Sequence, residues 1–91
     1  MSSISFAHLD TEARYWRSIL GEKYADNGLR WDVQVNYPMG TVIFKVVHPR
    51  DAAQMQKHPD LVSKIDVDRK KRPEEEIMAE IEAAVKSRLD R

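Results

Sequence analysis

Basic residues gather in one short stretch of this sequence, and basic side chains are the groups that bind phosphates and acidic surfaces. Five of the nine residues from 64 to 72 are basic. They are Lys64, Arg69, Lys70, Lys71 and Arg72. Three glutamates follow at 74–76 and can neutralise the run through space. Two interpretations stay open: a contact with nucleic acid or an acidic protein, and a solvated linker.

A second group of polar side chains alternates with large apolar ones between residues 29 and 37. Because successive side chains of a strand point to opposite faces, the polar set would share one face. This face comprises Arg30, Asp32, Gln34 and Asn36. It offers hydrogen-bond donors and acceptors, and an uncovered edge of such a strand can pair with a partner chain. The alternative is an ordinary solvated sheet face.

No pattern in the sequence indicates catalysis or metal binding. Asp66 and Asp68 resemble a carboxylate pair for a divalent ion, but calcium loops need further oxygens and a glycine, and basic residues follow here. Asp60 with residues 68–70 echoes a metal-dependent nuclease at too short a spacing. Metal-ligand spacing is also missing among the histidines, which are His8, His48 and His58. We expect no catalytic residue, no metal and no cofactor.

A β-hairpin over residues 29–48 is the element that must position the polar face. Its first strand alternates strictly, with large side chains at Leu29, Trp31, Val33, Val35 and Tyr37. Pro38 and Gly40 suit the turn. The return strand is rich in β-branched residues and apolar on both faces, so we expect it to be central or to face a partner.

The flanking segments read as helices. We predict a first helix over about 10–26, capped by Asp10, with Trp16 and Leu20 against the hairpin. Residues 1–7 are a tail or an edge strand. A short helix starts at Pro49, and residues 59–65 form another helical turn or a third strand.

The C-terminal part is the most highly charged. Residues 66–72 read as a charged linker. Pro73 then opens an amphipathic helix over 73–90, with its carboxylates in the first turn, where they suit the helix dipole.

The order of these predicted elements places the chain in the α+β class, and its length indicates a single domain over residues 1–91. The fifteen basic and fifteen acidic residues balance, so net charge argues neither for nor against nucleic acid. The chain has no cysteine, which fits a reducing compartment, and we expect a cytoplasmic protein. The N-terminal residues lack a signal-peptide pattern, and no apolar run is long enough to span a membrane.

In its size, composition and lack of cysteine, the chain resembles small phage-encoded inhibitor proteins such as anti-CRISPR proteins. That resemblance implies a non-enzymatic interaction protein that binds and blocks a larger partner, for example a nucleoprotein complex. It shares no motif with them, so no residue role is carried over. One alternative is a small nucleic-acid-binding regulator that uses the basic run at 64–72. A homodimeric structural module is the second alternative.

Overall fold

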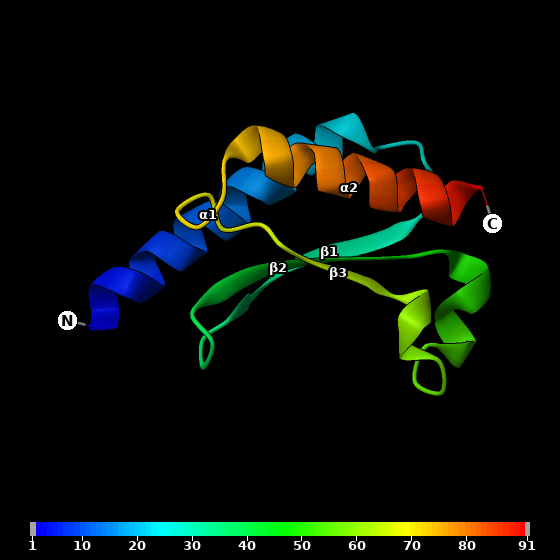
Figure 1. The fold of residues 1–91 in the computed structure, drawn as a ribbon, viewed down its shortest axis with the longest axis horizontal. Coiled ribbons are helices and arrows are strands. Elements are labelled where there is room, and N and C mark those ends of the chain that lie inside the picture. The colour runs from blue at the N-terminus through cyan, green and yellow to red at the C-terminus, as the bar shows by residue number, and fades with distance from the viewer. Residues whose placement is uncertain (1, 91) are drawn as a thin grey trace.

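The computed structural model describes residues 2–90, with side chains from residue 7 onward, and it has the α+β fold predicted from the sequence. Its elements are α1 (Ser2–Lys23), β1 (Arg30–Asn36), β2 (Thr41–Val47), the 3-10 helices η1 (Pro49–Gln54) and η2 (Pro59–Leu61), β3 (Ser63–Asp66) and α2 (Glu74–Leu89). Figure 1 shows α1 and α2 on the same face of the sheet, which leaves the other face without a helical cover.

The sheet is antiparallel, with strand order β1-β2-β3. The predicted hairpin is confirmed, and its register places Val33 opposite Phe44. Gly40 closes the turn with a φ of 66°, a conformation that glycine adopts at little cost. Its amide donates to the carbonyl of Tyr37 over 3.2 Å. The central position of β2 explains why this strand is apolar on both faces.

The large side chains of β1 point toward the helices, as the alternation predicts. Val33 is fully buried, and Trp31 and Val35 are half-buried against the core. Tyr37 departs from the pattern and is 49% exposed, because the strand ends at Asn36 and Tyr37 begins the turn.

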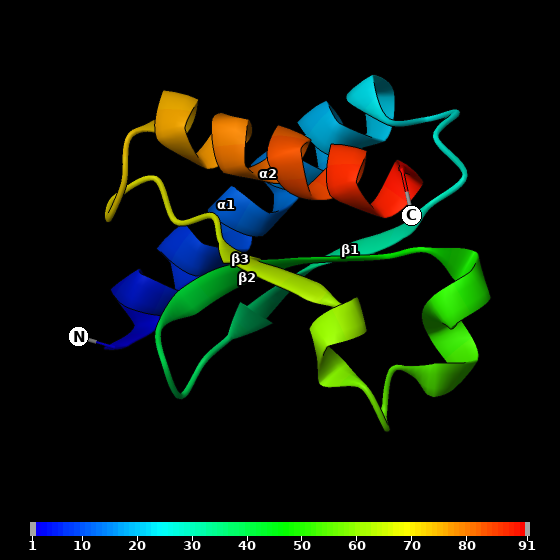
Figure 2. The same ribbon diagram turned by 45° about the vertical axis from the view of Figure 1, so that its right-hand side comes forward.

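One hydrophobic core lies between the sheet and the two helices (Figure 2). Trp16 and Leu20 are fully buried in it, so the prediction that this face of the first helix covers the hairpin is confirmed. The predicted C-terminal helix is also confirmed. Its buried stripe consists of Ile77, Ile81 and Val85.

The prediction for the N-terminal residues is wrong in two respects. Residues 2–7 form neither a tail nor a strand but the first turns of α1. Asp10 lies inside this helix instead of capping it, and its carboxylate accepts a hydrogen bond from the Tyr37 hydroxyl over 3.0 Å. The physical reason is Leu9, which is buried on the same helical face as Ala13 and extends the apolar stripe past Asp10.

The connections in the second half are more ordered than predicted. Residues 59–65 contain both of the proposed alternatives, a helical turn at η2 followed by the third strand, β3. The predicted charged linker is an irregular connection from β3 to α2, with Lys70 and Lys71 exposed. It is not solvated throughout, because Val67 is fully buried and Asp68 is 3% exposed. This segment is docked on the domain.

None of the helices in the described part of the chain has the length and apolar content that a membrane crossing requires.

Candidate binding face

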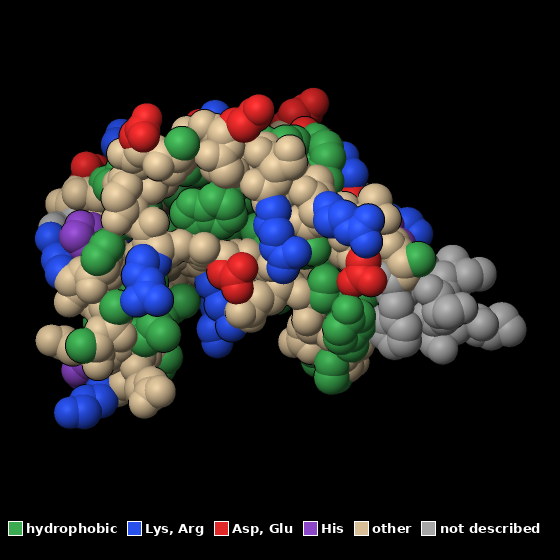
Figure 3. Space-filling view, turned by 180° about the vertical axis from the view of Figure 1, so that it is seen from behind, with side chains coloured by type: hydrophobic (Ala, Val, Ile, Leu, Met, Phe, Trp, Pro, Cys, Tyr) green, Lys and Arg blue, Asp and Glu red, His purple; other side chains and the backbone are tan. Residues whose placement is uncertain are grey.

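The face of the sheet opposite α1 and α2 is hollow and uncovered. Figure 3 shows the molecule as an arch whose hollow lies between two projections, which are the hairpin turn and the segment between β2 and β3. We call this surface the open face. Its outward sheet residues are Arg30, Asp32, Gln34, Lys45, Val47 and Lys64, and the wall beside them adds Ala52, Met55, Gln56, Pro59 and Val62. The cavity that they line has a volume of about 450 Å³.

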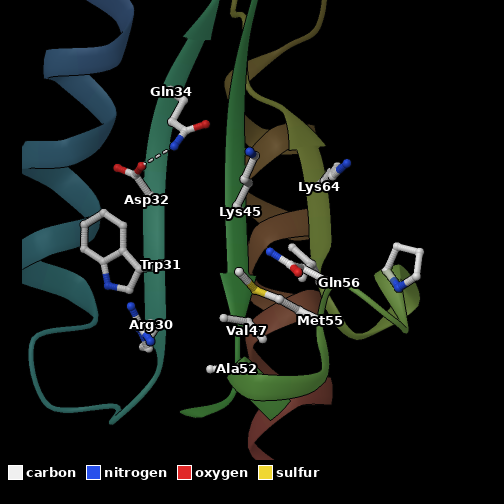
Figure 4. Close-up of a pocket in the computed structure, with 12 residues that line it drawn as sticks. Arg30, Trp31, Asp32, Gln34, Lys45, Val47, Ala52, Met55, Gln56 and Lys64 are labelled. Carbon is white, nitrogen blue, oxygen red and sulfur yellow. Dashed lines mark hydrogen bonds between the residues drawn. The ribbon is translucent and has the colours of Figure 1, made fainter.

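The strand register puts three charged residues in one row across the open face. Asp32 lies opposite Lys45, and Lys45 lies opposite Lys64 (Figure 4). The Asp32 carboxylate accepts a hydrogen bond from the Gln34 amide over 2.7 Å. Within the described residues, neither lysine has a carboxylate within ion-pair distance, and the same holds for Arg30. The lining of the cavity therefore has three cations against one anion. Asp66 shares the outward face of β3 with Lys64 but lies outside this lining, and its carboxylate is 3.8 Å from Lys71.

The wall of the open face comes from residues 48–62. The Nδ1 atom of His48 accepts a hydrogen bond from the Arg50 amide over 3.2 Å and so caps η1. Met55 is 41% exposed on this wall, and Met39 is 70% exposed at the hairpin turn on the other side. Flexible apolar side chains on both rims suit a contact surface.

A buried arginine fixes the wall to α2. Arg88 is 7% exposed, and its Nη2 atom donates to the carbonyl of Asp60 over 3.0 Å and to the Ser63 hydroxyl over 2.8 Å. Leu61, between these two partners, is buried. The wall is therefore anchored to the hydrophobic core beneath the sheet.

The structure separates the residues predicted to form a site. Arg30, Asp32, Gln34 and Lys64 come together on the open face. The rest of the basic run lies beside the helices (Figure 1). Asn36 is the last residue of β1 and is exposed, but it does not line this cavity, and its side chain accepts a hydrogen bond from the Met39 amide over 3.4 Å.

The arginines of the basic run are engaged in ion pairs within the chain. Arg69 donates from Nε and Nη2 to the two carboxylate oxygens of Glu12, over 2.8 and 2.5 Å, and from Nη1 to Glu74 over 3.3 Å. Its guanidinium lies 3.7 Å from the centre of the Tyr15 ring. These contacts raise the pKa of Arg69, with the Glu12 hydrogen bond as the largest cause.

The other members of the run differ in how far they are engaged. Arg72 donates to the carboxylate of Glu80 and, over 3.0 Å, to the carbonyl of Asp66. Lys71 lies 3.8 Å from the Asp66 carboxylate, and Lys70 is exposed. Two of the four charges at 69–72 are thus neutralised by close contacts that hold the segment to the helices.

His8, Glu12 and Asp68 form a cluster that sequence reasoning missed, with potential ligand atoms within 4.8 Å of one another. Nε2 of His8 lies 3.1 Å from Oδ1 of Asp68, and that oxygen also accepts from the Lys70 amide over 3.0 Å. Because Arg69 holds both oxygens of Glu12, a cation at this cluster would have to compete with its guanidinium for that carboxylate. We interpret the cluster as a structural network that ties the 67–72 segment to α1.

A sequence signal exists for two of the features that were missed, the His8–Glu12–Asp68 cluster and Lys45. His8 and Glu12 are four residues apart, which places them on one face of a helix. Lys45 shares the two-residue period of Ile43 and Val47, so the alternation of β2 assigns all three to the face opposite Phe44. The wall residues have no comparable signal, because their place depends on how the segment between β2 and β3 folds back.

Comparison of the chain with known protein families, with curated proteins and with solved structures finds no match.

Proposed function

We propose that this protein is a non-enzymatic interaction protein that binds a larger partner through its open face. The observation that carries the proposal is the uneven cover of the sheet. One face is buried under α1 and α2, while the other is hollow and holds three cations without an ion-pair partner among the described residues. A concave surface with uncompensated charge is suited to a partner of opposite charge.

The lining of the hollow supports a binding role over a catalytic one. Asp32 is the single carboxylate among the residues that line it, and none of these residues is a histidine, serine, threonine or cysteine. Acid–base and nucleophilic catalysis need a reactive group with a second group in hydrogen-bond reach to activate it. The Asp32 carboxylate is instead bonded to the Gln34 amide.

The internal ion pairs of the basic run favour this proposal over a nucleic-acid-binding regulator that uses residues 69–72. Phosphates would have to compete with Glu12 for Arg69 and with Glu80 for Arg72. An inhibitor that covers a surface of a nucleoprotein complex, as anti-CRISPR proteins do, is one function that fits the proposal. A cytoplasmic setting is part of it, because a cysteine-free chain needs no oxidising compartment.

The test is capture of partners from extracts of the source cells with three forms of the full chain. The open-face variant is K45S/K64S, and the matched control K70S/K86S removes the same charge from two exposed lysines outside the open face. We expect a protein that is retained by the wild type and the control and lost with the open-face variant. If every captured protein survives K45S/K64S, the open face is not the binding surface. Sedimentation of the pure chain separates a homodimer from a complex with another protein.

A further inference from the structure

The cross-strand pair Lys45–Lys64 lowers the folding stability of the free protein. Like charges directly opposite each other on neighbouring strands destabilise a sheet. The pairing register places these two lysines opposite each other, and Figure 4 shows both side chains on the open face. Asp32 lies on the other side of Lys45 and keeps its negative charge, but it is not within ion-pair distance of either lysine. An anionic group placed over the two lysines would relieve this repulsion.

The surroundings of the lysine pair are apolar. Val47 lies beside it on the sheet, and the wall adds Ala52, Met55, Pro59 and Val62. A partner that fits this surface therefore needs both negative charge and apolar side chains. Phosphates alone would leave the apolar half of the hollow in contact with water.

The aromatic side chain in the cavity lining is not placed to stack on bases. Trp31 is the aromatic residue of the lining, and its ring packs on Phe44 of the core with 6.1 Å between the ring centres. Figure 4 shows it to the side of β1, next to α1. Proteins that bind single-stranded nucleic acid by a sheet face use exposed aromatic rings for stacking. A protein partner fits the open face better than a nucleic acid.

The two edges of the sheet are partly blocked. Nη2 of Arg17 donates to the carbonyl of Val33 on β1 over 2.6 Å, and Nη1 of Arg72 donates to the carbonyl of Asp66 on β3. Charged side chains at an edge strand discourage the addition of another strand. A partner segment on the open face must then satisfy its own backbone hydrogen bonds, as a helix does.

We propose that the open face receives an acidic amphipathic helix of a partner protein. Its carboxylates lie over Lys45, Lys64 and Arg30, and its apolar side chains lie against Val47 and the wall. This inference rests on the proposed function and names the chemistry of the partner.

The test selects peptides from a random display library on the immobilised full chain, using peptides of about 16 residues, a length that permits a stable helix. We expect the enriched peptides to be acidic and to carry apolar residues at helical spacing. Their affinity for the K45S/K64S variant should be at least about tenfold weaker than for the wild type. The control K70S/K86S should bind them like the wild type, and thermal unfolding of each variant checks that it is folded.

Three results would overturn the inference. The first is enrichment of peptides that lack acidic residues or helical spacing, or no enrichment at all. The second is equal binding of the selected peptides to wild type and K45S/K64S. The third is a single-stranded oligonucleotide that binds the open face more tightly than the selected peptides do. If these results appear while a cellular partner still depends on Lys45 and Lys64, the proposed function stands and only the helix is wrong.

Discussion

Glu12 is an acid that the fold keeps charged in a buried position. It is 2% exposed, and its pKa is lowered, with the hydrogen bond from the Arg69 side chain as the largest cause and burial as an opposing one. A carboxyl whose pKa is lower in the folded state stabilises that state above its unfolded pKa. This stabilisation is lost as the pH falls through the lowered, folded pKa.

The first prediction follows from the lowered pKa of Glu12. Glu12→Gln removes the charge and should lower the free energy of unfolding by about 2 kcal/mol near neutral pH, the range for hydrogen bonds to charged groups. The difference between wild type and variant should stay constant down to the ordinary glutamate pKa of 4.5 and shrink below it. Urea unfolding at a series of pH values measures this difference in the free energy of unfolding. Glu22→Gln, an exposed change on the same helix, should have little effect. A difference that does not change with pH would show that the charge of Glu12 is unimportant.

At the scale of elements, the alternation of residues 29–37 was enough to predict β1 and the face that it buries, because a period of two residues has one structural solution. The start of α1 was missed because Asp10 has the chemistry of a cap, although Leu9 already belongs to the buried stripe. The docking of 66–72 was unpredictable for another reason. It depends on Arg69 meeting Glu12, which lies 57 residues earlier in the chain.

The sequence predicted part of the candidate site, as it predicted part of the fold. The period of β1 placed Arg30, Asp32 and Gln34 on one outward face, and the structure confirms that face as exposed. The third strand carries Lys64 to this face, and the sequence left that strand as one of two alternatives. The wall was not foreseen, since short 3-10 helices have no periodicity that marks them.

Two glycines provide the second prediction, because replacement by alanine should change the stability of the protein in opposite directions at the two positions. Gly40 has a φ of 66°, so Gly40→Ala places a side chain in the left-handed region and should destabilise the hairpin by about 1 kcal/mol. Gly21 lies in α1, and an added Cβ meets no atom within 4 Å, so Gly21→Ala should stabilise by about 0.5–1 kcal/mol. Thermal and urea unfolding of both variants test this. Stabilisation by Gly40→Ala would contradict the turn geometry.

Arg88 provides the third prediction, which concerns the wall of the open face. Arg88→Ala removes the donor that holds the Asp60 carbonyl and the Ser63 hydroxyl. The amides of Leu61 and Val62, bonded within η2, should lose at least about tenfold of their protection from hydrogen exchange. The strand amides between β1 and β2 should change less. Lys86→Ala on the exposed side of α2 is the control, and an equal loss at all amides would mean general destabilisation instead of a local anchor.

At the scale of the whole molecule, the residues of the open face that favour binding are unfavourable for the stability of the free protein. The free protein tolerates Lys64 opposite Lys45, and no carboxylate among the described residues pairs with either. Functional surfaces are often less stable than the fold allows, because the groups that a partner needs are unfavourable without it. The lysine pair is then a place where replacement should improve folding and impair function.

The fourth prediction is that Lys64→Glu makes the protein more stable and less able to bind. An opposite charge across from Lys45 should raise the free energy of unfolding by about 0.5 kcal/mol at low ionic strength, and about 0.5 M salt should remove most of the gain. The same change should lower the affinity of the open face for every acidic ligand, because it replaces an attractive charge with a repulsive one. Lys70→Glu, at an exposed position outside the open face, should produce neither effect. Urea unfolding at two salt concentrations and peptide binding in the same buffers measure the pair of effects. A loss of stability with Lys64→Glu would mean that the two lysines do not repel each other in the folded protein, and the argument for an anionic partner would lose its physical basis.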